Sequence, residues 1–528
     1  MFHSSKFFKG FLNTIFLFTI FFTVSEEELT LSDLHKYHLD RSPFKETKNL
    51  SKKERLENGL PPDRFYEQMY ELTIDPATGE PNYQSKIEVE KELEAIKNNP
   101  KPFVVPGESV AQPWYELGPN DAAGRSRAAL WDLSDGSYQR VFAGGVSGGL
   151  WKNENITSNI SNWTKVDGVP GNLSVSIIIQ DPDNTNIMYL GTGEKYTYGD
   201  ASGNGIYKST DGGANWSLIY GRGTGTVTST GGPAPAQTVV AGFFYVNDLA
   251  LYDHDNNPAT QRQLFAAIGG GSIRSRYMTS TFQDVNEFGL YKSTNGGTSF
   301  TKITSVNSGA GISRLDEVND IDIQAVNNRL WLSTNRNIYG NSYGGRVWYT
   351  DDGTNFNNAT PVLPAYPVVD LTRIERTEIA PSAIDTDTHY ILMRVTNTAS
   401  GTIPIIYKTT DNYANLTYII GPADADTGIP DEDFTRGQSG YDLEIEIDPS
   451  SNDIVYVGGI DWFRSQDGGG SWSQITKWSN NNNLFGLGCS IVHADQHGLY
   501  FRPGLPNQAI VANDGGIAYS SNLLDAHE

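Results

Sequence analysis

The stretch Ser209-Thr-Asp-Gly-Gly-Ala-Asn-Trp216 decides the fold, and the run Ile206-Tyr-Lys208 precedes it. Its pattern is Ser or Thr, any residue, Asp, any residue, Gly, two further residues and an aromatic ring. The Asp side chain can accept backbone N–H bonds across a tight turn, the Gly supplies a left-handed backbone angle, and the ring packs back under the turn. The stretch therefore predicts a β-hairpin whose turn supplies its own hydrogen bonds.

This turn motif recurs four more times. Close copies span residues 293–300 and 465–472, and weaker copies span 349–356 and 409–416. The Asp positions are separated by 84, 56, 60 and 56 residues, which suits one four-stranded unit per copy. We expect the structural positions of the motif to be Ser209, Asp211, Gly213, Trp216, Asn295, Gly297, Phe300, Asp351, Gly353, Phe356, Asp411, Ser465, Asp467, Gly469 and Trp472.

The repeated unit predicts how the chain is organised. A four-stranded unit of this size cannot bury its apolar face without stacked neighbours, and radial stacking leaves only short, protected sheet edges. The sequence therefore predicts an all-β fold, a β-propeller of about six to seven four-stranded blades over residues 113–528. The last blade is expected to be incomplete, because the sequence stops at Glu528, just where a further turn motif is due after Asn513-Asp-Gly-Gly516.

The N-terminal region has a different character. Residues 1–25 combine basic residues, an apolar run from Phe11 to Val24 and an acidic stretch that follows, which predicts a secretory signal peptide. Residues 26–112 are charge-dense and predict a polar leader with two helices. One carries Phe65, Met69 and Leu72 on a single face, and the other is marked by Ile87, Leu93 and Ile96 and ends at Asn98-Asn-Pro100. Disorder is the alternative for this leader.

Composition limits the possible partners. The formal net charge is −23, which disfavours nucleic acid and anionic membrane surfaces because both would repel the chain. One cysteine, Cys489, leaves no intramolecular disulfide, which suits a secreted bacterial protein better than a eukaryotic ectodomain. We expect a monomer with no membrane span in the mature chain.

Taken together, these motifs resemble the Asp-box (BNR) repeat propellers, a group that includes sialidases, sortilin-type domains and xyloglucan-cleaving endoglucanases. Secreted Bacteroidetes propeller proteins are the most similar, on the strength of Gly118-Pro119, Gly124-Arg-Ser-Arg127, Gly148-Gly-Leu-Trp-Lys152 and Gly191-Thr-Gly-Glu194. The resemblance implies a secreted protein, in relatives often carrying a sorting domain for type IX secretion. It also implies that the turn motifs lie at the blade periphery and are structural. The sialidase signature Phe-Arg-Ile-Pro is absent, which disfavours a sialidase.

Metal binding is one candidate chemistry. His493, Asp495 and His497 stand at alternate positions, so in a strand all three side chains would point to one face. Two imidazoles and a carboxylate could hold a divalent cation, with zinc or iron better suited than calcium. The alternative is a polar channel strand with hydrogen-bonded histidines.

Glycoside hydrolysis is the other candidate chemistry, and it needs two carboxyl groups that face each other across a sugar. Glu194, Asp248 and Asp442 are the candidate catalytic residues, each with an alternative role as a loop charge or strand cap. Two hypotheses follow. The first is a secreted or cell-surface propeller that binds an extracellular polysaccharide or a surface protein through loops of its central face, without catalysis. The alternative is an extracellular glycoside hydrolase resembling the propeller endoglucanases.

Overall fold

The structure is a computed structural model, and it describes two stretches of the chain. The first covers residues 30–79 except 43, 45, 48, 59, 61, 62, 77 and 78, with 89, 92, 93 and 95 beyond it. The second covers 124–525 except 172, 198–200, 202, 229–237, 243, 244, 270–272, 275–280, 283–287, 304–317, 336–343, 365–373, 398–400, 431 and 432. The chain divides into two compact units, residues 1–82 and 83–528. The expected signal peptide lies outside the described residues.

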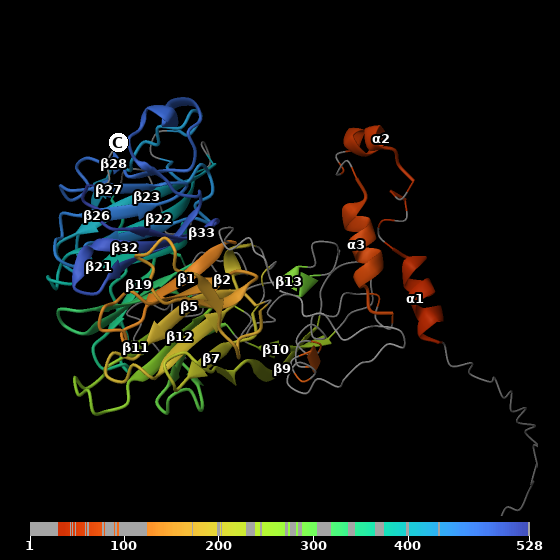
Figure 1. The fold of residues 1–528 in the computed structure, drawn as a ribbon, viewed down its shortest axis with the longest axis horizontal. Coiled ribbons are helices and arrows are strands. Elements are labelled where there is room, and N and C mark those ends of the chain that lie inside the picture. Colours follow the sequence, from red (N-terminus) through yellow and green to blue (C-terminus); the bar gives the residue numbers. More distant parts are fainter. Residues whose placement is uncertain are drawn as a thin grey trace, which may run out of the picture. The chain divides into compact units, whose positions relative to one another are not determined.

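The described residues of the N-terminal unit form three helices, α1 (Leu31–Leu39), α2 (Lys52–Glu57) and α3 (Phe65–Thr73) (Figure 1). The first two begin at capping boxes, in which Thr30 and Asp33, or Ser51 and Glu54, exchange side-chain and backbone hydrogen bonds. No helix among the described residues is both long and apolar enough to cross a membrane. Most of the second expected leader helix lies outside the described residues.

The face that α3 buries differs from the prediction. Phe65 and Leu72 are exposed, while Glu67 and Tyr70 are buried. Glu67 accepts hydrogen bonds from Arg55 on α2 at 2.7 Å and from Arg64 at 2.8 Å. Helical spacing of apolar residues was misleading here, because an ion pair rather than an apolar stripe joins α3 to its neighbour.

The second unit is a β-propeller of seven blades, as the repeated unit predicted. Six sheets have four strands in sequence order, and the seventh has three described strands. The blades are β1 (Ser126–Trp131), β2 (Val141–Gly145), β3 (Gly149–Asn153) and β4 (Trp163–Lys165); β5 (Val175–Gln180), β6 (Met188–Thr192), β7 (Ile206–Ser209) and β8 (Ser217–Tyr220); β11 (Val246–Tyr252), β12 (Gln263–Ile268), β15 (Gly289–Ser293) and β16 (Thr301–Lys302); β17 (Val318–Gln324), β18 (Arg329–Thr334), β19 (Val347–Thr350) and β20 (Asn357–Asn358); β21 (Ile374–Pro381), β22 (His389–Asn397), β23 (Gly401–Thr409) and β24 (Thr417–Ile419); β25 (Glu444–Ile447), β26 (Val455–Gly458), β27 (Trp462–Ser465) and β28 (Ser473–Gln474); and β31 (Gln496–Arg502), β32 (Leu505–Asn513) and β33 (Gly516–Ser520). The remaining strands form the pairs β9 (Arg222–Thr228) with β10 (Thr238–Gly242), β13 (Ile273–Arg274) with β14 (Thr281–Phe282), and β29 (Thr476–Lys477) with β30 (Ser490–Ile491).

The blades close into a ring. The first strand of each blade contacts the first strand of the next, and β1 contacts β31 and β32 of the seventh blade. In Figure 1 the orange β1 accordingly lies near the blue β32 and β33. Trp131 Nε1 donates to the backbone oxygen of Tyr500 at 2.9 Å, and the Tyr500 hydroxyl donates to the backbone oxygen of Arg127 at 3.2 Å. The seven first strands therefore enclose a central channel.

The hydrophobic core lies between blades rather than inside one. One buried cluster holds Phe142 of the first blade against Met188 and Trp216 of the second. Comparable clusters occupy the other six interfaces, including the closing one, where Trp131 and Ala129 meet Ile510. Each fully buried large side chain stabilises the fold by about 1.5–3 kcal/mol, so the blades depend on their neighbours.

The turn motifs connect the third and fourth strands and have the predicted hydrogen bonds. Ser209 Oγ accepts from the backbone N–H of Gly213 at 2.9 Å, and Asp211 Oδ1 accepts from that of Asn215 at 2.9 Å. Gly213 has a φ of +84°, and a Cβ there would lie 2.7 Å from Phe142 of the preceding blade. The glycine therefore provides both the turn and the close approach of two blades.

One motif position was predicted wrongly. In the fourth blade Asp352, not Asp351, takes the turn role, because its Oδ1 accepts from the backbone N–H groups of Thr354 and Asn355. Asp351 instead pairs with Arg329 at 2.7 Å. This copy of the turn is one residue shorter between its Thr350 and its Phe356, which moves the acidic position by one.

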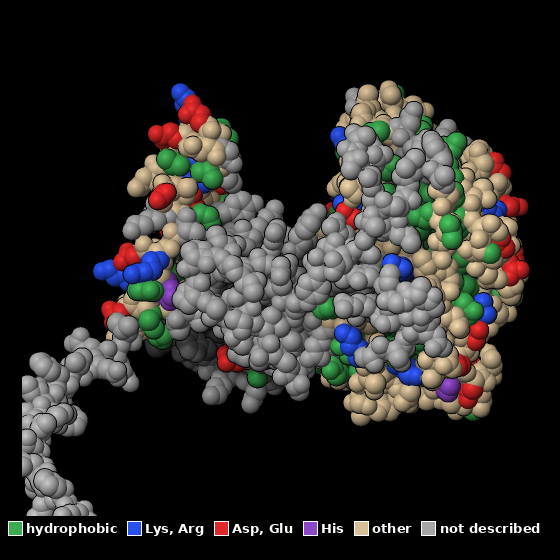
Figure 2. Space-filling model, turned by 180° about the vertical axis from the view of Figure 1, so that it is seen from behind, with side chains coloured by type: hydrophobic (Ala, Val, Ile, Leu, Met, Phe, Trp, Pro, Cys, Tyr) green, Lys and Arg blue, Asp and Glu red, His purple; other side chains and the backbone are tan. Residues whose placement is uncertain are grey.

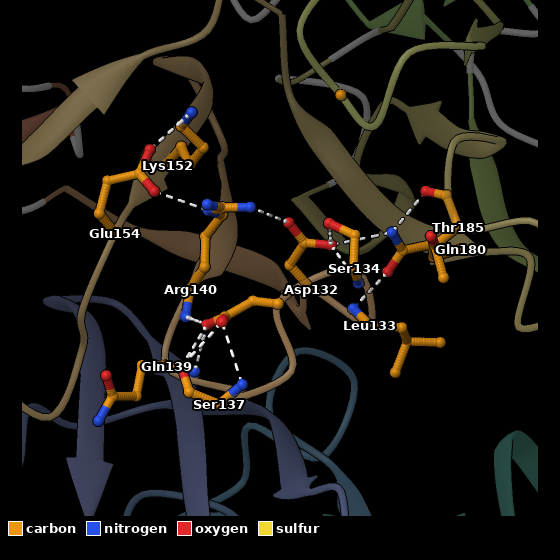
Figure 3. A network of polar contacts seen from close by, with 12 residues as sticks. Asp132, Leu133, Ser134, Ser137, Gln139, Arg140, Lys152, Glu154, Gln180 and Thr185 are labelled. Atoms are coloured by element: carbon orange, nitrogen blue, oxygen red, sulfur yellow. Dashed lines mark hydrogen bonds and ion pairs between the residues drawn. The ribbon is translucent and has the colours of Figure 1, made fainter.

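Polar contacts join the first two blades at the end of the ring that carries the turn motifs (Figure 3). Gln180 at the end of β5 donates to Asp132 Oδ1 at 3.0 Å and accepts from the backbone N–H of Leu133 at 2.7 Å. Arg140 bridges Asp132, at 3.0 Å, to Glu154, at 2.6 Å. These contacts are remote from the end of the channel described next, and they stabilise the interface.

Candidate functional site

The candidate site lies at the end of the propeller where the first strand of every blade begins, which we call the entry face. Six first strands have an irregular register close to this end: β1, β5, β11, β17, β21 and β31. A β-bulge leaves backbone groups outside the ladder. Side chains of the preceding blade bind them: Asn247 donates to the backbone oxygen of Val318 at 2.9 Å, and Asn319 to that of Thr377 at 2.8 Å.

Two arginines of the first blade hold Glu194 of the second blade. Arg125 Nη2 donates to Glu194 Oε2 at 2.7 Å, and Arg127 Nε donates to Glu194 Oε1. Burial opposes ionisation of Glu194, but the charges of Arg127 and Arg125 outweigh it and hold the pKa of this carboxyl below its ordinary value. The Glu194 side chain has no exposed surface, whereas Arg125 is 29% exposed. Glu194 is therefore an ionised partner of the two arginines at neutral pH.

Tyr441 links this pair to the seventh blade. Its hydroxyl accepts from Arg125 Nη1 at 2.8 Å and donates to Asp514 Oδ1 at 2.6 Å. The same Asp514 oxygen lies 2.8 Å from His497 Nε2. Burial is the main cause that lowers the pKa of His497 to about 4, so the imidazole is neutral at pH 7 and donates its Nε2 proton to Asp514.

A third arginine, Arg376 of the fifth blade, completes the charged group. Its Nε donates to Glu378 at 2.5 Å, and its Nη1 donates to the backbone oxygen of Tyr441 at 3.1 Å. Arg376 and Arg127 lie over the ring of Tyr196, at 4.1 and 4.8 Å from its centroid. Charged and aromatic side chains from five blades thus converge on one end of the channel.

Further carboxyl groups line the channel behind this cluster. Asp248 Oδ2 accepts from the backbone N–H of Ile321 at 2.7 Å, and Asp320 Oδ2 accepts from that of Ile379 at 2.9 Å. Burial and then the charge of Glu378 raise the pKa of Asp322 to about 7 and that of Glu444 to about 8. Burial and the charge of Asp322 also raise the pKa values of Asp248, Asp320 and Glu446. Asp248, a candidate catalytic residue, therefore supports the bulge of the next blade.

The third catalytic candidate, Asp442, begins the sixth blade. Its side chain is fully buried, and neither carboxyl oxygen has a hydrogen-bond partner. Burial and then the negative charge of Asp495 raise its pKa well above the ordinary value. Asp442 is thus influenced by the charge of Asp495, while Glu194 and Asp248 have other partners.

The three residues proposed for metal binding do not share a strand face. β31 begins at Gln496, and Asp495 has a left-handed φ of +65°, so the expected alternation is interrupted between His493 and His497. His493 is exposed, whereas His497 is buried against Asp514. Among the side chains that the structure describes, no group of three or more His, Cys, Asp or Glu residues could hold a metal ion.

Reasoning from the sequence did not select Arg376, Glu378, Tyr441 or Asp514 as site residues. The sequence gives one local indication of these residues: a polar residue recurs near the start of the first strand of each blade. The Gly124-Arg-Ser-Arg127 motif was recognised as a family feature without a role. The structure shows that its two arginines bind Glu194 of the Gly191-Thr-Gly-Glu194 motif.

A cavity of about 270 Å³ lies at the opposite end of the second and third blades. Asp181, Asp183, Tyr189 and Arg262 are among the residues that line it. Arg262 already pairs with Asp183 at 2.6 Å and lies 3.8 Å from Asp253. The charged groups of this cavity bind one another, so the entry face is the better candidate.

No protein-family model matches the chain, and no curated protein matches it either. Among solved structures, it is similar to the Niastella koreensis GH74 enzyme at 16% identity and a TM-score of 0.44, and to the Xanthomonas campestris GH74 xyloglucanase at 15% and 0.47. Each match covers 77% of this chain and 53% of the enzyme, so the chain spans about half the length of these relatives. YCF48 from Cyanidioschyzon merolae is similar at 13% identity and a TM-score of 0.42, over 77% of this chain and 97% of that one.

These likenesses concern the fold and say nothing of activity. The class that fold and site define is a seven-bladed β-propeller with a charged cluster at the entry face. Every arginine named in this cluster has a carboxylate partner. It can position hydrogen-bond donors and acceptors toward a ligand that approaches the channel.

Proposed function

We propose that this protein is a secreted β-propeller that binds an extracellular glycan or protein at its entry face, without catalysing a reaction. Propeller ligands bind where loops of several blades converge, and polar groups from five blades converge here. Arg125 and Asp514, which are 29% and 25% exposed, are among the members of the cluster that a ligand can reach.

The observation that carries the proposal is the state of Glu194. A catalytic carboxyl must touch substrate and exchange a proton or form a bond. Glu194 has no exposed surface, and two arginines hold it as an anion. Asp248, the second candidate, accepts backbone hydrogen bonds with both oxygens. These residues maintain the shape and charge of a binding surface.

The alternative, an extracellular glycoside hydrolase, draws on a different observation. Asp495 is partly exposed, and burial together with the charge of Asp514 raises its pKa to about 6, while burial and then the charge of Asp495 raise the pKa of Asp442 well above its ordinary value. A carboxyl with a raised pKa beside a second carboxyl is the arrangement of a general acid. This reading requires Asp442 or Asp495 to reach a sugar.

The test is a panel of plant and algal polysaccharides incubated with the purified full chain. We expect retention on at least one polysaccharide or surface protein and no release of reducing ends. Release that Asp442→Asn or Asp495→Asn abolishes, with circular dichroism unchanged, would establish the hydrolase instead. Glu194→Gln serves as the matched comparison, because it is expected to weaken the entry face without affecting any chemistry.

A further inference from the structure

A second place for a ligand is the cavity of about 270 Å³ between the second and third blades, at the end of the propeller opposite the entry face. The β5–β6 connection contributes Asp181 and Asp183 to its lining, and the β11–β12 connection contributes Arg262. Each connection is held by its own hydrogen bonds: the Asp183 N–H donates to Asp181 Oδ1 at 3.0 Å, and the Thr260 N–H donates to the backbone oxygen of Asn257 at 2.9 Å. The walls of the cavity are therefore preformed, which lowers the entropic cost of binding.

An ion pair joins the two walls and leaves part of each charged group unused. Arg262 Nε donates to Asp183 Oδ2 at 2.8 Å and lies 3.6 Å from Asp181 Oδ1. Among the described residues, Asp181 Oδ2, Asp183 Oδ1 and Arg262 Nη1 have no hydrogen-bond partner, and the three side chains are 15%, 28% and 15% exposed. The lining therefore offers a ligand two acceptor oxygens and one donor nitrogen.

The pairing inside the cavity disfavours an ion as its ligand. Arg262 already holds the position between the carboxylates that a cationic ligand would take, with Asp253 Oδ2 3.8 Å from its Nη2. No three His, Cys, Asp or Glu side chains in the described part of the chain could hold a metal ion. An anion would meet Asp181 and Asp183. The net charge of −23 also repels anions over longer distances, and Figure 2 shows acidic side chains spread along one edge of the propeller face in view. A neutral ligand therefore fits this cavity best.

Apolar side chains complete the lining. Leu251 and Tyr189 are 8% and 2% exposed, and Ile187 is half-buried. A ligand that matches both parts of the cavity has an apolar C–H face and neutral polar groups that both donate and accept hydrogen bonds. A sugar ring has this combination. The volume lies just below the range of about 300–1,000 Å³ for pockets that bind drug-sized molecules, so it suits one ring rather than a chain of several.

We infer that this cavity binds one neutral sugar ring, whose hydroxyl groups donate to Asp181 and Asp183 and accept from Arg262. Hydrogen bonds with charged partners are roughly twice as strong as those between neutral groups, so three of them favour a ring of matching stereochemistry. The ion pair holds the three side chains in place before the ligand arrives, which favours binding further. The site lies apart from the entry face and does not rest on the binding function proposed there.

The test titrates the full chain with the methyl glycosides of glucose, galactose, mannose and xylose, followed by saturation-transfer difference NMR. We expect at least one of them to bind with a Kd of about 1 mM, as a ligand of this size allows. Asp181→Asn and Asp183→Asn each exchange an acceptor oxygen for a donor group, so each should weaken binding about tenfold. Asp255→Asn is the matched control and should leave binding unchanged, because Asp255 is exposed on the same connection as Arg262 and is not among the residues that line the cavity.

A second readout uses the unsubstituted protein, so it does not depend on how the variants fold. The affinity for a neutral ring should change by no more than about twofold between about 50 mM and about 500 mM sodium chloride, because salt screens interactions between charges. The saturation should be strongest at the ring protons of one face, the face that packs against Tyr189, Ile187 and Leu251. Methylammonium and acetate, as charged probes, should show no binding in the same experiment.

Four results would overturn the inference: no methyl glycoside binds, both variants bind it as tightly as wild type, its affinity falls steeply with salt, or methylammonium or acetate binds in its place. Failure here is distinct from failure of the function proposed for the entry face. A ring that binds wild type and not the variants would keep the cavity site even if no polysaccharide or surface protein were retained. Retention on a polysaccharide without binding of any methyl glycoside would remove only the cavity site.

Discussion

Lys208 of the second blade extends to the turn motif of the third blade, where its Nζ donates a 2.8 Å hydrogen bond to the backbone oxygen of Gly296. Lys292 of the third blade makes the same contact with Gly353 of the fourth, also at 2.8 Å. The lysine that precedes one turn motif thus binds the glycine of the next motif around the ring. The motif stabilises the interface between blades as well as its own hairpin.

Lys208→Met tests this contact. Methionine keeps most of the apolar length but leaves the backbone oxygen of Gly296 without its donor, so we expect unfolding free energy to fall by about 1–2 kcal/mol. Urea denaturation, monitored by tryptophan fluorescence, measures this free energy. Lys53→Met, at a side chain 85% exposed on α2, is the control. Equal effects of both substitutions would contradict the assigned role of Lys208.

The turn motif itself makes a sharper prediction at Asp211. Asp211→Ala removes the acceptor for the Asn215 N–H and should destabilise the propeller by about 1–2 kcal/mol. Asp211→Asn should change the stability little, because the motif of the third blade already has Asn295 at the Asp position. Its Oδ1 accepts from the Ser299 N–H at 2.9 Å. Thermal unfolding of the two variants side by side is the measurement. If Asp211→Asn lost as much thermal stability as Asp211→Ala, the charge of the side chain, rather than its hydrogen-bond geometry, would be what stabilises the turn.

His389 gives a pH dependence of known sign. It is fully buried, and this burial lowers its pKa from 6.5 to about 4. Between pH 6.5 and pH 4 the unfolded chain binds a proton that the folded chain does not, so stability falls as the pH falls. When the pH is lowered from 7.5 to 5, the unfolding free energy of wild type should fall by about 2 kcal/mol relative to that of His389→Gln. A difference that is constant with pH would refute this role.

The contribution of Asp322 to stability should depend on pH in the opposite direction. Burial and then the charge of Glu378 raise its folded pKa to about 7, above the unfolded value of 3.8. Between pH 4 and pH 7 the folded chain therefore binds a proton that the unfolded chain has lost, so stability falls as the pH rises through this window and levels off above pH 7. The unfolding free energy of Asp322→Asn should gain about 2–3 kcal/mol on that of wild type between pH 5 and pH 8. Urea unfolding at both pH values tests it, with Asp255→Asn as the matched surface substitution.

Local features of the fold were predictable from the sequence. The turn at Ser209–Trp216 depends on hydrogen bonds within eight consecutive residues, and the strands at 175–180 and 188–192 follow from their apolar pattern. The Asp351 assignment was wrong because a shortened turn shifts the acidic residue by one position. Helices α1 and α2 were missed, although Thr30 with Asp33 and Ser51 with Glu54 carry a recognisable capping pattern.

The site was largely unpredictable for a physical reason. Arg127 donates to the backbone oxygen of Tyr441 across 314 residues of sequence, and only closure of the ring brings them together. Glu194 could be picked out as an acidic residue in a loop, but its two arginine partners could not. The influence of the Asp495 charge on Asp442 likewise depends on two adjacent blades and could not be predicted from either segment alone.

Contact between the first blade and the seventh has a consequence for how the propeller unfolds. In an open stack the terminal repeat can detach after losing one interface, whereas every blade of this ring must lose two. Partial unfolding should therefore be rare, and the propeller should denature in a single cooperative step. A protease that cuts one connection between blades would leave every interface intact, so a nicked molecule should stay assembled and migrate as two fragments only after denaturation.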